Sequence, residues 1–181
     1  AGLASAGCVA FSQASQPVTD LQSLYRAMQY AATYDFAVWL RPQDYQLAKD
    51  GVAHDGEMAA RLGLAGIPVA AETVAIATLI ELAKSTGVRL HLMRLSSAAG
   101  VAMVREAKAR GVAVSCDVAA HHLHLAEEDI GYFNAQARFD PPLRSVTDRA
   151  ALRFGLAEGV IQAVCSDHTP MEADGKQVPF G

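Results

Sequence analysis

Short β-like runs alternate with longer helical patterns along this chain, and that order constrains the fold more than any other feature. Apolar runs rich in Val predict strands at Gly7–Ser12, Phe36–Leu40, Val88–Leu95, Val112–Val118 and Val160–Ser166. Apolar residues at helical spacing predict helices at Val18–Tyr34, Ala71–Ser85, Ala99–Arg110 and Thr147–Glu158. Strands and helices in this alternation form parallel βα units, so the sequence predicts an α/β fold.

Glycines mark the ends of these helices. Gly87, Gly111 and Gly159 each follow an expected helix, where a left-handed backbone commonly ends the last turn. Two long stretches, Asp44–Pro68 and Ala119–Arg144, carry no such regular pattern, and we expect them to be mostly connections.

Composition excludes several classes of protein. Half of the 181 residues (51%) are apolar, which argues against a disordered chain. The 15 Lys and Arg residues are scattered and the net charge is −4, so no nucleic-acid footprint is visible. No apolar stretch is long enough to cross a membrane. Three cysteines, Cys8, Cys116 and Cys165, lie in β-like runs, where buried reduced thiols of a cytoplasmic protein are expected.

Polar residues gather at the carboxyl ends of the expected strands. Both an open doubly wound sheet and a (β/α)8 barrel would fit the alternation, but no Gly-x-Gly-x-x-Gly follows any strand, which weakens the first. Barrel enzymes place their chemistry at these carboxyl ends. The residues concerned are Arg41, Arg94, Ser96, Asp117, His121, His122, Asp167 and His168.

Two histidine motifs could bind a metal or move protons. Asp167-His168 closes the last strand, although such a pair also serves as a turn. His121 and His122 follow the fourth strand, but no partner ligand stands at a defined spacing, so hydrogen bonds to loop carbonyls are the favoured explanation. We expect His91 to be a core histidine whose hydrogen bonds are satisfied, and His54 to be solvated.

Arginines stand where metal ligands would be expected. A guanidinium has five donors and no lone pair, so Arg41 and Arg94 cannot ligate a cation. They would instead bind an anion or pair with Asp44, Asp117 or Asp167. Arg144 follows the rigid Asp140-Pro141-Pro142 loop, where it could hold an anion or brace the next helix.

The sequence resembles bacterial dihydroorotases of the amidohydrolase superfamily, through residues 66–130, 139–152 and 163–170. The segment from His91 to Ser96 is similar to the His-x-x-His-x-Ser motif of that family. Similar matches are Asp117 to Leu123 with Glu-Val-x-Pro-His-His-Leu, Asp140 to Arg144 with Asn-Pro-Pro-Leu-Arg, and Ser166 to Met171 with Thr-Asp-His-Ala-Pro-His. The resemblance implies a (β/α)8 TIM barrel of amidohydrolase type and zinc-dependent opening or closing of the dihydroorotate ring.

The departures from this pattern fall on the metal site. Asp167 is the one member of the metal and catalytic set that is retained, and we expect it to be vestigial. Ala14, Arg41 and Arg94 occupy positions of family metal ligands; Asp140, Ala120 and Met171 replace an Asn, a Pro and a His of the family motifs. One carboxylate beside two guanidinium groups gives one ligand in a repulsive field, so no metal and no cofactor are expected. We expect Arg94 to form an ion pair with Asp167.

By this resemblance the chain is a non-catalytic dihydroorotase homologue that is a structural partner of the aspartate carbamoyltransferase catalytic chain in pyrimidine biosynthesis. The resemblance leaves remnants of a substrate pocket at Arg144, Asp140, His121, His122 and His168. The alternative is an active zinc-dependent dihydroorotase or cyclic amidohydrolase. Its metal would be held by ligands outside this chain together with Asp167 and with His121 or His122. A third class, an anion-binding module built on Arg41, Arg94 and Arg144, has no independent support.

The length sharpens the expected architecture. A complete eight-stranded barrel needs about 250 residues, and the five expected strands correspond to strands 4 to 8. We therefore expect residues 1–181 to form one partial barrel domain that lacks the N-terminal strands and the last helix. A sheet with open edges needs its missing strands or a partner, so an oligomer in the cytoplasm is expected.

Overall fold

The structure is a computed structural model that describes residues 2–13, 18–170, 172 and 180. Five parallel strands form its main sheet, in the order β1-β2-β5-β6-β7. These strands are β1 (Ala10–Ser12), β2 (Ala37–Leu40), β5 (Arg89–Leu92), β6 (Val114–Ala119) and β7 (Ala163–Cys165). All five expected strands are therefore present, each shorter than the apolar run that predicted it.

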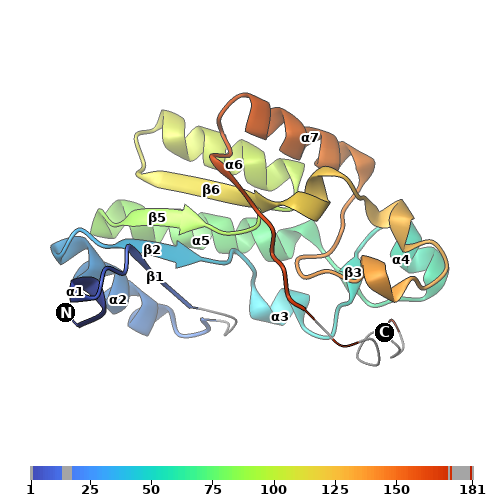
Figure 1. The fold of residues 1–181 in the computed structure, drawn as a ribbon, viewed down its shortest axis with the longest axis horizontal. Coiled ribbons are helices and arrows are strands. Elements are labelled where there is room, and N and C mark those ends of the chain that lie inside the picture. Colours follow the sequence, from blue (N-terminus) through green and yellow to red (C-terminus); the bar gives the residue numbers. More distant parts are fainter. Residues whose placement is uncertain (1, 14–17, 171, 173–179, 181) are drawn as a thin grey trace.

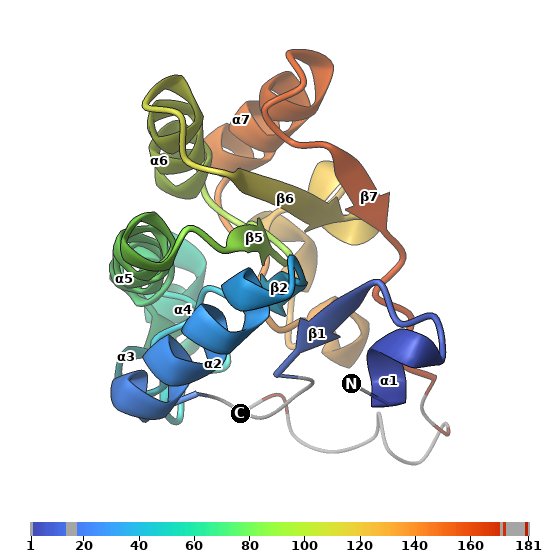
Figure 2. The ribbon, with the colours of Figure 1, turned by 90° about the vertical axis from the view of Figure 1, so that its left-hand side faces the viewer.

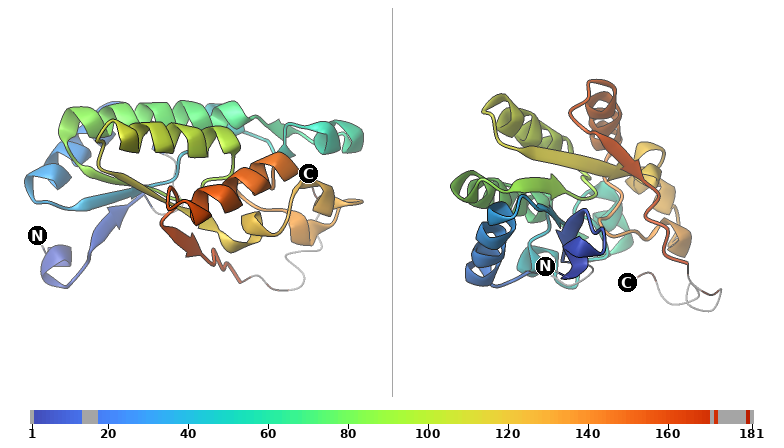
Figure 3. Two further views of the ribbon diagram at one scale, coloured as in Figure 1. Left: turned by 90° about the horizontal axis from the view of Figure 1, so that it is seen from above. Right: turned by 60° about the vertical axis from the view of Figure 1, so that its left-hand side comes forward.

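Helices cover the convex side of this curved sheet, as the end-on view shows (Figure 2). They are α2 (Leu21–Thr33), α5 (Val69–Thr86), α6 (Ala98–Ala109) and α7 (Val146–Ala157). In Figure 3, α5 and α6 lie side by side over the strands. A four-residue helix, α1 (Gly2–Ser5), precedes β1. The three glycines expected after helices, Gly87, Gly111 and Gly159, all have positive φ angles.

The main core lies between the sheet and these helices. Alternate strand residues such as Val38, Leu90 and Cys116 face the helices and are buried. Because side chains alternate along a strand, the residues between them face the concave side. Trp39, His91, Ser115 and Asp117 lie on that side, where the Trp39 and His91 rings are 4.6 Å apart.

Short elements gather beyond the carboxyl ends of the strands (Figure 1). The expectation that Asp44–Pro68 is mostly connection was wrong. This stretch contains α3 (Tyr45–Ala48), β3 (Ala53–His54), α4 (Glu57–Leu62) and β4 (Gly66–Ile67), with β3 and β4 paired in parallel. Each is too short for a period to stand out in the sequence. After β6 come the 3-10 helices η1 (Ala120–Leu123), η2 (Glu127–Ile130) and η3 (Ala135–Ala137).

A second apolar core holds these short elements together. It contains Ala53, Met58, Ile130, Leu143 and Phe180, with Ala59 and Ala137. The three cysteines were expected to be buried reduced thiols. All three are free, but only Cys116 is buried, whereas Cys165 is half-buried and Cys8 is exposed. No helix among the described residues is long and apolar enough to span a bilayer.

Candidate functional site

The centre of the candidate site is an ion pair at the carboxyl end of the sheet. Arg94 Nη1 donates to Asp167 Oδ1 at 2.8 Å, and the two side chains are 19% and 22% exposed. The ion pair expected from the sequence is therefore confirmed. Arg94 and Asp167 both have left-handed backbones, with φ of 58° and 47°. That conformation is uncommon for residues other than glycine, and such residues cluster at functional sites.

A buried carboxylate holds the turn that carries Arg94. Asp117 Oδ1 accepts from the backbone N–H of Arg94 at 2.8 Å, and the carbonyl of Asp117 accepts from Leu95 N at 3.0 Å. Burial alone would raise the pKa of Asp117, but hydrogen bonds from His91, Arg94 and Cys165 outweigh it and lower the pKa. Asp117 therefore remains an anion under the strained turn. The sequence placed Asp117 at a strand end but did not indicate this role.

His91, in β5, contacts two side chains of the neighbouring strand β6, those of Asp117 and Ser115. Its Nε2 lies 2.9 Å from Asp117 Oδ2 and its Nδ1 lies 2.8 Å from Ser115 Oγ. The side chain is 11% exposed. The expectation of a satisfied core histidine is confirmed.

Arg41 has a different partner from those expected. Its Nη2 donates to the carboxylate of Asp140 and to Gln43, so pairing with Asp44, Asp117 or Asp167 was wrong. The side chain of Asp44 caps α3 by accepting from Leu47 N. The carbonyl of Asp140 also accepts from Arg94 Nη1 at 3.4 Å. Asp140 thus links both arginines across the strand ends.

Arg144 is buried and joins several elements of the structure. The residue is 3% exposed, and its guanidinium donates to Ser96 Oγ at 2.9 Å, to His54 Nδ1 at 3.0 Å and to Ile67 O at 3.0 Å. These three partners lie after β5, in β3 and in β4, so Arg144 braces these elements and not the start of the next helix, as one interpretation of the sequence had it. The expected solvated His54 was wrong, because this side chain is half-buried against Arg144.

Glu72 completes this buried group. One carboxylate oxygen accepts from Ser96 N at 2.7 Å and the other from Ser96 Oγ at 3.0 Å. Burial raises the pKa of Glu72, while Arg144 and the two serines that follow Leu95 act in the opposite direction. Sequence reasoning missed Glu72, which resembles any acidic residue in the first turn of a helix.

The paired histidines lie behind the Asp140 loop. His122 is 2% exposed and its Nε2 lies 3.1 Å from Pro142 O, which confirms the loop-carbonyl explanation for this residue. His121 stacks on Phe139 at a ring distance of 4.0 Å, and its buried Nε2 has no hydrogen-bond partner among the described residues. Burial lowers the pKa of His121; Arg94 lowers it further, whereas Asp167 raises it.

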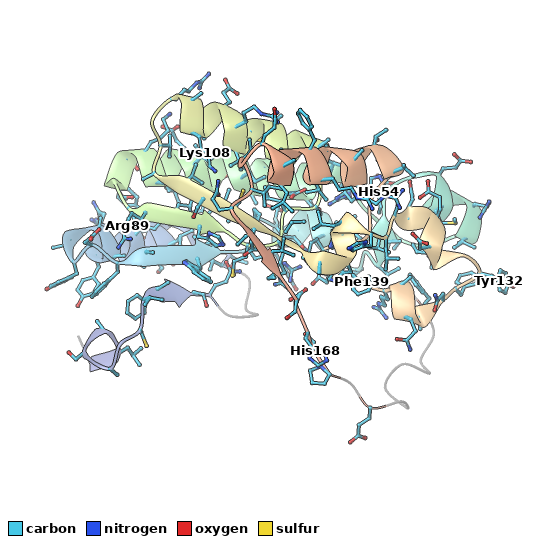
Figure 4. The ribbon with its side chains drawn as sticks, turned by 45° about the horizontal axis from the view of Figure 1, so that its top comes forward. His54, Arg89, Lys108, Tyr132, Phe139 and His168 are labelled. Carbon is cyan, nitrogen blue, oxygen red and sulfur yellow. The ribbon has the colours of Figure 1, made fainter. Side chains whose placement is uncertain are left out.

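The expected site residue His168 does not join this group. His168 is exposed, on the chain segment that leaves β7 and runs away from the sheet (Figure 4). Ala14 and Met171 lie outside the described residues. The site that the structure brings together therefore consists of Arg41, Arg94, Asp140 and Asp167, backed by Asp117 and His91.

The side chains of this site do not fit a zinc ion. Zinc needs three or four lone-pair donors around one point. Among the described residues, no group of three or more His, Cys, Asp or Glu side chains is placed to hold a metal. The carboxylates of Asp167 and Asp140 each accept a hydrogen bond from a guanidinium, that of Arg94 and that of Arg41 respectively.

Comparison with known proteins identifies the family of this chain. The model of the family described as Dihydro-orotase-like matches residues 1–99. The chain belongs to this family. A "Dihydroorotase-like protein" of Pseudomonas aeruginosa is 47% identical over 174 residues, which cover 96% of this chain and 41% of that protein. A "Dihydroorotase" of Pelotomaculum thermopropionicum is 42% identical over 97% of this chain and 42% of its own length. The chain thus spans about two fifths of these relatives.

Solved structures show the same fold as this dihydro-orotase-like chain. An L-hydantoinase (dihydropyrimidinase) from Arthrobacter aurescens aligns over 92% of this chain and 39% of its own, with a TM-score of 0.77 and 24% identity. Dihydroorotase from Saccharomyces cerevisiae, in complex with 5-fluoroorotic acid, aligns over 98% and 50% with a TM-score of 0.73 and 16% identity. The expected α/β fold resembling part of an amidohydrolase TIM barrel is confirmed.

Proposed function

We propose that this chain is part of a dihydroorotase-like protein of pyrimidine biosynthesis that does not itself catalyse the dihydroorotase reaction. The observation that carries the proposal is the 2.8 Å ion pair between Arg94 and Asp167. By the family resemblance, Arg94 occupies the position of a metal ligand and Asp167 is the retained carboxylate. A guanidinium on that carboxylate takes the place where a cation would be bound.

Charge and chemistry both argue against catalysis by this site. Arg41 and Arg94 supply two permanent positive charges and no lone pair, so a divalent cation would be repelled. Without a bound metal, water keeps a pKa far above neutrality and is a poor nucleophile. The ion pair instead keeps the strand ends together with fixed charges of the protein.

The role left to such a protein is structural. By the resemblance to inactive dihydroorotase homologues, we infer that its partner is the catalytic chain of aspartate carbamoyltransferase in the cytoplasm. A binding role needs an intact fold and surface, and the buried network around Asp117 and Glu72 supports an intact fold. The relatives named "Dihydroorotase-like protein" in two Pseudomonas species support the dihydroorotase-like assignment on which this inference rests.

The decisive experiment uses the full-length protein. Metal content, turnover of dihydroorotate, and co-purification with co-expressed aspartate carbamoyltransferase are measured on the same preparation. We expect no stoichiometric zinc, no turnover, and a stable complex with the transferase. Stoichiometric zinc together with turnover would refute the non-catalytic role, and failure to form the complex would refute the proposed partner.

A matched variant tests the reason for inactivity. Arg94→His restores the family residue at the end of β5, and Arg94→Gln removes the charge without adding a strong ligand. If the arginine excludes metal, zinc binding should increase with His and not with Gln. Equal zinc binding by both variants would show that Arg94 is not what excludes the metal.

An active zinc-dependent dihydroorotase or cyclic amidohydrolase is the second candidate. The relative from Pelotomaculum thermopropionicum that bears the name "Dihydroorotase" supports it, as does the unpartnered Nε2 of His121 near Asp167. This candidate requires metal ligands outside the described residues. It predicts that chelation abolishes turnover by the full-length protein and that added zinc restores it.

A further inference from the structure

His54 lies between two groups that would favour its two protonation states. It ends β3, and in Figure 4 it lies at the end of the sheet that carries the short elements. On one side is the guanidinium of Arg144, with Nη1 at 3.0 Å from His54 Nδ1. On another side is Glu127, a residue of η2 that is 8% exposed.

The contact with Arg144 fixes the state of the ring. A guanidinium only donates, so His54 Nδ1 must accept and cannot carry a proton. The ring is therefore neutral, with its proton on Nε2. Protonation of Nδ1 would place two donors and two positive charges against each other, and this contact would break.

Glu127 offers the opposite environment. Its Oε2 is fully buried and has no hydrogen-bond partner among the described residues. A Cβ atom placed on Gly56 would lie 2.7 Å from Glu127 Oε2 and 2.8 Å from His54 Cδ2, so both side chains border the same small space. A buried carboxylate oxygen without a donor is costly, and a protonated imidazole would supply that donor.

We propose that His54 is a proton-sensitive contact that binds Arg144 when neutral and turns to the carboxylate of Glu127 when protonated. Other charges around His54 are those of Asp55, its neighbour in the chain, and Asp148 in the first turn of α7. Burial lowers the pKa of His54 most and Arg144 lowers it further, whereas Glu127, Asp148 and Asp55 raise it. The exchange therefore occurs below the usual histidine range.

The exchange would couple two parts of the fold. Arg144 also donates to Ile67 O in β4 and to Ser96 Oγ after β5. It therefore joins the β3–β4 pair to the main sheet. The backbone of Glu127 donates to the carbonyl of Arg144 at 2.8 Å. Acid would thus loosen one contact between β3 and the Asp140–Arg144 loop and form another with η2, next to the ion pairs at the strand ends.

The test is nitrogen NMR of the full-length protein with ring-labelled histidine, in which His54 is assigned by its loss in His54→Gln. At pH 7.5 we expect a protonated Nε2 and an unprotonated Nδ1. Glu127→Gln removes the charge at nearly constant shape and should lower the midpoint of the His54 titration by about one pH unit. Asp55→Asn is the matched control at an exposed acid and should shift the midpoint less.

Three results would overturn the proposal. They are a proton on Nδ1 at neutral pH, an equal shift in Glu127→Gln and Asp55→Asn, and a His54 ring that stays neutral down to pH 4. None of these results bears on whether the protein binds zinc, turns over dihydroorotate or binds a transferase. Failure of the switch and failure of the proposed function are therefore distinguishable.

Discussion

Acid should destabilise this fold through His122, because its ring is buried in the neutral state. The residue is 2% exposed, and one ring nitrogen donates to Pro142 O while the other is buried without a partner among the described residues. Its pKa is lowered from 6.5 to about 4, and burial is the largest cause. The nearby His121 and Arg144 also lower the pKa, against the opposing effects of the Pro142 carbonyl and Asp167.

The magnitude follows from linkage between proton binding and folding. Between pH 6.5 and 4 the unfolded chain binds a proton at His122 and the folded protein does not. Stability therefore rises with pH in that window: the contribution is complete above pH 6.5 and is lost as the pH falls to 4. At about 1.4 kcal/mol per pKa unit, the loss amounts to roughly 3 kcal/mol.

The variant His122→Gln tests this reasoning, since its amide can still donate to Pro142 O but does not titrate. Urea unfolding of the full-length protein is measured at intervals between pH 8 and 4.5, with His168→Gln as the control at an exposed histidine. We expect His122→Gln to lose about 2 to 3 kcal/mol less than wild type over this range, and the control to behave like wild type. A wild-type acid loss in His122→Gln would refute the assignment.

Three further experiments test the site and its surroundings. A double-mutant cycle of Arg94→Met and Asp167→Asn should give a coupling of about 1 to 3 kcal/mol in urea unfolding, because both partners are about four-fifths buried; additive effects would show that the pair is not coupled. Asp140→Asn should cost less than about 1 kcal/mol in the same assay, since its side chain is 58% exposed beside Arg41. Gly56→Ala should lower stability by about 1 to 3 kcal/mol, because its Cβ would stand 2.7 Å from a buried carboxylate oxygen; a thermal melting temperature equal to that of wild type would contradict the close approach.

The main sheet could be predicted because its signals are local. Each strand is an apolar run, and each long helix has its own period, with a glycine after α5, α6 and α7, so no knowledge of distant contacts is needed. The prediction for Asp44–Pro68 was wrong because the elements of this stretch depend on contacts with distant residues. Its helices of four and six residues and its two-residue strands are stabilised by the second core, which includes residues as distant as Leu143 and Phe180.

The sequence could predict the contacts of the site only where opposite charges alone determine which side chains pair. Asp167 and Arg94 pair because two opposite charges meet beyond the ends of β7 and β5, the strands on either side of β6. Arg41 pairs with a different carboxylate from those expected, that of Asp140, which lies 99 positions away in the chain. The roles of Glu72 and Asp117 depend on hydrogen bonds across 24 and 23 positions of the chain, and no spacing in the sequence reports such contacts.

The backbone at the candidate site is held by groups that would remain if the ion pair were removed. Arg94 N is bound by Asp117, and two positions later the backbone and side chain of Ser96 are both bound by Glu72. A left-handed residue costs free energy and persists only when its surroundings fix it. The turn that aims residue 94 at Asp167 is therefore built by two buried carboxylates, and the guanidinium uses a position that it does not itself create. For this reason Arg94→His should keep the local backbone, and zinc binding by that variant reports on the side chain alone.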